Sequence, residues 1–186
     1  LFLSNISVTL YSSATLIILG AFATDLVVGY YSAAEKIMMV PRQLLGVFSQ
    51  AIYSKVCLLA DQGYHSLEKL WRKLMPPFLV AVFLICLAML VFSNELAHFV
   101  TGHSSKSVSF LIKLLSFVPF IVALNIQSYQ TLLAYNLRVQ CLSILVFASL
   151  SNILINGILS YFFGATGTVI SLLITEAIIS VGLYVM

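Results

Sequence analysis

The chain has 186 residues, of which 61% are hydrophobic and only 8% are charged, and its mean hydropathy is +1.09. Because soluble domains carry about 25% charged residues, this composition excludes a water-soluble globular protein and indicates a chain whose solvent is lipid. The net charge of +3 is small, and no basic run with interleaved aromatics suggests a nucleic-acid partner.

Six segments are long and apolar enough to cross a hydrocarbon core about 30 Å thick, which takes about 20 helical residues. They cover about residues 2–23, 27–56, 76–92, 108–135, 139–163 and 165–186. Pro76 and Pro77 are predicted to open the third span, because a missing N–H group costs nothing in a first helical turn, and Pro119 lies inside the fourth. The sequence therefore predicts an all-α fold: a polytopic membrane bundle of about six helices that forms a single unit over residues 1–186.

Lys and Arg are distributed unevenly between the two ends of these spans. The loops after spans two and four contain five of them: Lys55, Lys69, Arg72, Lys73 and Arg138. The opposite side offers Lys106 in a loop and Lys113 just inside the fourth span. Since cytoplasmic loops are enriched in Lys and Arg, we expect the five basic residues and both termini to face the cytoplasm.

The segment between spans two and three, residues 61–73, places leucines and Trp71 at helical spacing between charges. It is predicted to be either an amphipathic segment at the interface, with Trp71 among the headgroups, or an extension of the neighbouring helices.

The second span is unusually polar for a membrane helix. It contains three charged residues, although a charge at the bilayer centre costs about 2.5–3.5 kcal/mol. At 100° per residue, positions seven apart nearly coincide. Its polar side chains therefore form two neighbouring stripes, Glu35, Arg42 and Ser49 in one and Lys36, Gln43 and Gln50 in the other.

Two interpretations of this polar face are open. In the first, Lys36 and Arg42 line a cavity and attract an anionic group. In the second, Glu35 pairs with one of the cations and the set only fixes helix packing. The first is favoured because one carboxylate can neutralise only one of the two cations.

Two further spans contain polar residues that bear on function. Span five has a stripe of small polar residues, namely Ser149, Asn152, Asn156 and Ser160. Such stripes commonly join membrane helices, and the alternative is that they line a cavity. Glu176 is the only ionisable residue in span six. A buried carboxyl without a cation favours its neutral form, so Glu176 is predicted to be an ion-coupling site or a hydrogen-bonded structural acid.

The sequence contains no motif for catalysis, metal binding or phosphate cradling. Its three cysteines have no C-x-x-C spacing. His98 and His103 fall in an outer loop and are expected to be solvated. We therefore expect neither an enzyme nor a cofactor or metal.

Two stretches resemble a known family. The first is ILGAFATDLVVGYYSAAEKI at 18–37 with GVFSQAIYSKV at 46–56, and the second is NILINGILSYFFGATGTVISLLITE at 152–176. They resemble the polysaccharide transporter family, the Wzx-type O-antigen flippases, within the multidrug/oligosaccharidyl-lipid/polysaccharide flippase superfamily. The resemblance implies about twelve spans in two lobes of six helices, related by an axis along the membrane normal. The chain looks like the C-terminal lobe, a fragment whose missing N-terminal lobe would be needed for transport.

The resemblance also implies a function. It implies transport of undecaprenyl-pyrophosphate-linked oligosaccharide across the bacterial inner membrane by alternating access, among membrane lipids and with a polysaccharide polymerase and chain-length machinery as partners. The candidate site residues are Lys36 and Arg42 for the diphosphate, Gln43, Gln50 and Asn156 for sugars, and Glu35 and Glu176 for ion coupling or structure. The alternatives are a multidrug/cation antiporter of the same superfamily, and a non-transporting membrane subunit or truncated fragment.

Overall fold

The computed structural model describes residues 14–102 and 105–185, and within these ranges the chain forms helices and no strands. A helical stretch at residues 14–22 comes first. The helices that follow are α2 (Asp25–Asp61), α3 (Tyr64–Val91), α4 (Ser93–Thr101), α5 (Lys106–Leu115), α6 (Val118–Ala134) and α7 (Arg138–Val185). The prediction of an all-α fold is confirmed. Most of the first predicted span, 2–23, lies outside the described residues.

Four helical segments are long and apolar enough to cross a membrane: Asp25–Asp61, Tyr64–Val91, Lys106–Ala134 and Arg138–Val185. Many of their large apolar side chains face outward. On α3, for example, Val80 is 59% exposed and Leu84 is 57% exposed, and on α7 Phe162 is 70% exposed. Such a surface suits hydrocarbon and not water, so the protein is a multi-pass membrane protein.

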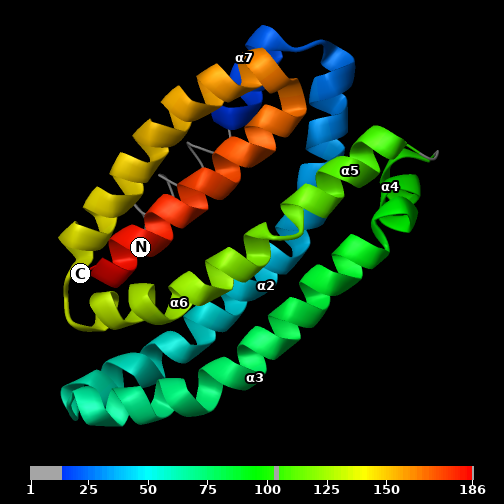
Figure 1. Ribbon diagram of the computed structural model, residues 1–186. Helices are drawn as coiled ribbons and strands as arrows, with labels where there is room; N and C mark the ends of the chain where they lie inside the picture. The colour runs from blue at the N-terminus through cyan, green and yellow to red at the C-terminus, as the bar shows by residue number, and fades with distance from the viewer. Residues whose placement is uncertain (1–13, 103–104, 186) are drawn as a thin grey trace.

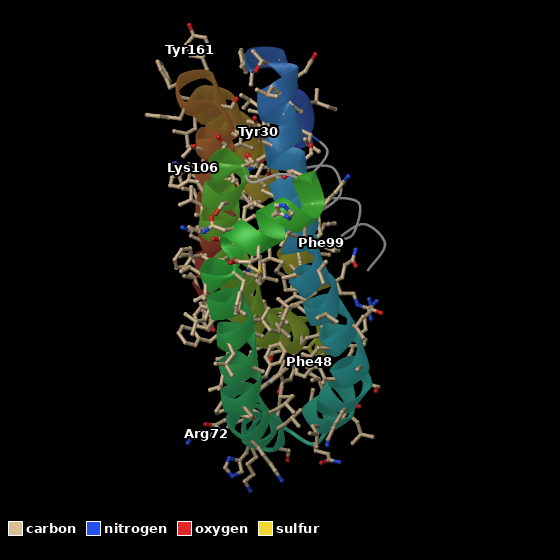
Figure 2. All side chains as sticks on the ribbon, turned by 90° about the vertical axis from the view of Figure 1, so that its right-hand side faces the viewer. Tyr30, Phe48, Arg72, Phe99, Lys106 and Tyr161 are labelled. Carbon is tan, nitrogen blue, oxygen red and sulfur yellow. The ribbon has the colours of Figure 1, made fainter. Side chains whose placement is uncertain are left out.

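The long helices share one axis and alternate in direction (Figure 1). α2 runs from the upper end of the bundle in this view to the lower left, α3 returns, and α5 and α6 run back beside α2. Figure 2 shows Arg72 at one end of the bundle and Tyr161 near the other. In Figure 1 the loop after α2 and the loop after α6 both lie at the lower left, so the two loops near the basic residues share one end of the bundle.

α7 is a helical hairpin that reverses at Gly164, where the backbone leaves the helical region (φ 55°, ψ −135°). We call residues 138–163 its first limb and residues 165–185 its second limb. A glycine is needed at this point because the positive φ is unfavourable for other residues. The limbs meet closely just beyond the turn, since a Cβ on Gly167 would lie 2.0 Å from the carbonyl oxygen of Leu159. The sequence placed the boundary between its last two spans at this glycine.

α3 begins at Tyr64, twelve residues before Pro76, so the two prolines do not open the helix as expected. The segment before them is an extension of the helix, one of the two predicted alternatives. Trp71 is 4% exposed and its Nε1 donates a hydrogen bond to Thr131 Oγ1 of α6 at 3.0 Å. Packing of this amphipathic turn against α6 outweighs the hydrogen bonds that the prolines remove.

The fourth predicted span is two helices, because α5 ends at Leu115 and α6 starts at Val118. Pro119 lies in the first turn of α6, where its missing N–H group is tolerated. The connection between α3 and α5 also contains the short helix α4, which ends at Gly102 in the left-handed region (φ 73°). The break between α5 and α6 and the helix α4 were not predicted from the sequence.

Candidate functional site

The two polar stripes of α2 face different surroundings. Glu35 is buried and Arg42 and Ser49 are partly buried against the bundle, and we call these three the inner stripe. Lys36, Gln43 and Gln50 are exposed, and we call them the outer stripe. The polar face predicted from the sequence therefore divides into one half that packs against other helices and one half on the surface of the chain.

Arg42 of the inner stripe forms a salt bridge with Glu176 of the second limb of α7. The distance from Nη2 to Oε1 is 2.7 Å, and the two side chains are 15% and 3% exposed. A buried carboxylate needs such a partner, because an isolated charge in an apolar interior is strongly disfavoured. Glu176, which has no cation in its own span, obtains one from a helix 134 positions away.

Glu35 is the other acid of the inner stripe. Among the described residues it forms no salt bridge with Lys36 or Arg42, although the residue is buried, at 9% exposed. It stands seven residues before Arg42 on α2, which corresponds to about 10 Å along the helix axis. Among the described residues, the acid that forms a salt bridge with Arg42 is therefore Glu176.

Ser49, the third member of the inner stripe, joins α2 to α6. Gln130 Nε2 donates hydrogen bonds to the carbonyl oxygen of Ser49, at 3.0 Å, and to its hydroxyl. Gln130 Oε1 and Asn125 Oδ1 of α6 are buried and accept no hydrogen bond from the described residues. The sequence did not identify this polar layer, because the polar residues of α6 do not share one helical face.

The outer stripe places a cation and two amides on the surface of a membrane-spanning helix. None of the residues that the structure describes forms an ion pair with Lys36. The neighbouring positions Val40 and Val47 are 61% and 66% exposed, so the exposed face of α2 is half polar and half apolar. Acyl chains cannot solvate the polar half, and a membrane helix with such a face normally borders water, a polar ligand or another polar protein surface.

Asn156 lies apart from both stripes. It is fully buried, and its Nδ2 donates to the carbonyl oxygen of Thr15 at 3.3 Å. One turn earlier, Asn152 accepts a hydrogen bond from Thr15 Oγ1 at 3.2 Å and donates to Thr175 Oγ1 at 2.8 Å. These contacts fasten residues 14–22 to the two limbs of α7, which favours the packing interpretation of this stripe.

Comparisons with known proteins agree with the resemblance inferred from the residues. The chain is similar to the protein named "Putative O-antigen transporter" of Escherichia coli (strain K12), with 26% identity over 96% of this chain and 43% of that protein. It is also similar to the protein of the same name of Shigella dysenteriae, with 28% identity over 96% of this chain and 44% of that protein. The chain thus spans less than half the length of these curated relatives. No protein-family model and no solved structure matches it.

Proposed function

We propose that this chain is the C-terminal lobe of a transporter that moves a lipid-linked oligosaccharide, carried on undecaprenyl diphosphate, across the bacterial inner membrane. Transport would proceed by alternating exposure of a cavity between this lobe and an N-terminal lobe, with both ends of this chain in the cytoplasm. The names of the two relatives support a role in polysaccharide transport. The observation that carries the proposal is the outer stripe of α2, a polar and cationic surface on a helix that crosses the membrane.

The chemistry of the polar face suits such a substrate. A diphosphate needs cations and hydrogen-bond donors, and Lys36 and Arg42 supply both. Sugars need groups that donate and accept hydrogen bonds, which the exposed amides of Gln43 and Gln50 provide. The lipid tail can remain in the bilayer beside the apolar half of the same face. Asn156 is too deeply buried in this conformation to contact a sugar.

Two other functions are compatible with a multi-pass membrane protein. A multidrug/cation antiporter would need an acidic, aromatic surface to attract cationic drugs, whereas the outer stripe is basic. A non-transporting subunit would use this face only to dock a polar or acidic surface of a partner protein, and it would not need amides suited to sugars beside the cation. The charge and the amides of the outer stripe therefore favour transport of an anion over both.

The test replaces Lys36 by Gln in the native protein, in a strain that depends on it for surface polysaccharide. Lys36 is exposed, so the substitution should leave folding intact. The loss of a charge-assisted hydrogen bond should reduce surface polysaccharide about tenfold or more. Lys55→Gln is the matched control, because Lys55 is an exposed lysine of the same helix near its basic end.

Normal surface polysaccharide with Lys36→Gln, at wild-type protein level in the membrane, would reject the proposed role of the outer stripe. Altered drug resistance with unchanged polysaccharide would favour the antiporter.

A further inference from the structure

The Arg42–Glu176 pair has a second consequence if Arg42 helps to bind an anion. We infer that the Glu176 carboxylate is a built-in competitor of the substrate, which occupies the Arg42 guanidinium until a diphosphate displaces it. This inference rests on the proposed function and concerns the regulation of the same site. It makes Glu176 a positioning residue that sets how tightly, and how selectively, an anion is bound.

The geometry supports competition for one guanidinium. Arg42 Nη2 is 2.7 Å from Glu176 Oε1, a short charge-assisted contact of the kind that a phosphate oxygen would also make. A carboxylate and a phosphate both approach a guanidinium in its plane, through its fork of N–H donors. Glu176 therefore holds Arg42 by the chemistry through which a diphosphate would bind it.

The two partners differ in access from outside. Arg42 keeps 15% of its side-chain surface exposed and Glu176 only 3%, so an entering ligand meets the cation before it meets the acid. Arg42 also borders the outer stripe, since Gln43 is its neighbour in sequence. Gly46, one turn below Arg42, lies between the two stripes and is exposed, and a Cβ built there meets nothing within 4 Å. The surface of α2 is therefore open one turn from Arg42, between the two stripes.

Displacement would also change how the helices are joined. The salt bridge connects α2, which carries the outer stripe, to the second limb of α7. When a diphosphate takes the guanidinium, this connection between the two helices breaks. Ligands with a single weak negative charge would gain too little from Arg42 to replace a buried carboxylate, so the pair favours strongly charged anions.

The test measures binding of farnesyl diphosphate to the native protein in lipid nanodiscs. Glu176→Gln should bind this probe about tenfold more tightly than wild type, because the competing charge-assisted hydrogen bond is lost. Arg42→Gln should bind it about tenfold more weakly. Glu95→Gln is the matched control, because it removes an exposed carboxylate of α4, away from Arg42, and should change the affinity less than about twofold.

Glu176→Asp covers the case in which Glu176→Gln fails to fold. Asp keeps the charge but is one methylene shorter, which weakens the contact, so its affinity should lie between those of wild type and Glu176→Gln. Unchanged affinity in the folded Glu176 variants, with weakened binding in Arg42→Gln, would overturn the competition and leave the proposed function standing. Equal binding by wild type, Arg42→Gln and Lys36→Gln would overturn both.

Discussion

The Arg42–Glu176 salt bridge predicts a large and specific loss of stability when one partner is removed. Arg42→Met would leave the Glu176 carboxylate 3% exposed and without its cation. Removing one partner of a buried pair costs about 3–5 kcal/mol. Because Arg42 keeps 15% of its side-chain surface exposed, the pair is not completely enclosed, and we expect a loss near the lower end of this range, about 3 kcal/mol.

The double variant Arg42→Met/Glu176→Met should be much more stable than the single variant Arg42→Met. Replacing a whole buried ion pair by apolar residues of similar volume is often neutral or stabilising, so we expect it within about 1 kcal/mol of wild type. Reversible unfolding in mixed micelles with increasing SDS measures all four members of the double-mutant cycle. If the double variant lost as much stability as the two single variants together, the side chains would not interact and the reasoning would be wrong.

Two further predictions concern the hairpin and the topology. Gly164→Ala should lower the free energy of unfolding by about 1–3 kcal/mol, because the positive φ of this residue is strained for alanine. The control is Gly157→Ala, in the helical first limb, which should raise the free energy of unfolding slightly because a Cβ there meets nothing within 4 Å. Equal effects of the two substitutions would contradict the assigned turn. A reporter enzyme fused after Lys73 should be active in the cytoplasm and one fused after Gly102 in the periplasm, while the opposite pattern would reverse the orientation inferred from Lys and Arg.

The parts of the fold that depend on local sequence were predictable. Hydropathy located the long apolar helices, and the positive residues placed the loops after α2 and α6 at the same end. The glycine at the α7 turn was visible as a short break between two apolar runs. Each of these features depends on residues close together in the chain.

Other boundaries depended on contacts between distant residues. Pro76 and Pro77 suggested a helix start, but the preceding turn packs Trp71 against α6 and keeps the helix continuous. The break between α5 and α6 could not be located from composition alone, because the apolar run continues through it. At the start of α3, packing against α6 contributed more to the free energy of folding than the low helix propensity of the two prolines.

The candidate site shows the same division. Periodicity revealed that α2 has a polar face, and the presence of Glu176 in an apolar span was visible without a structure. The sequence did not show which stripe faces the bundle, because a helical pattern gives the angles between residues but not the direction of the neighbouring helices. Nor could the pattern separate Asn156, which packs helices together, from the exposed amides of Gln43 and Gln50.

The sequence by itself determined that this protein lies in a membrane, where its apolar helices run, and that one helix carries charge at a depth where lipid cannot solvate it. Only the tertiary structure decided that Arg42 meets Glu176, while Lys36 stays on the surface. The physical reason is that hydropathy and periodicity are properties of neighbouring residues. A salt bridge between positions 134 apart depends on how two helices are placed side by side.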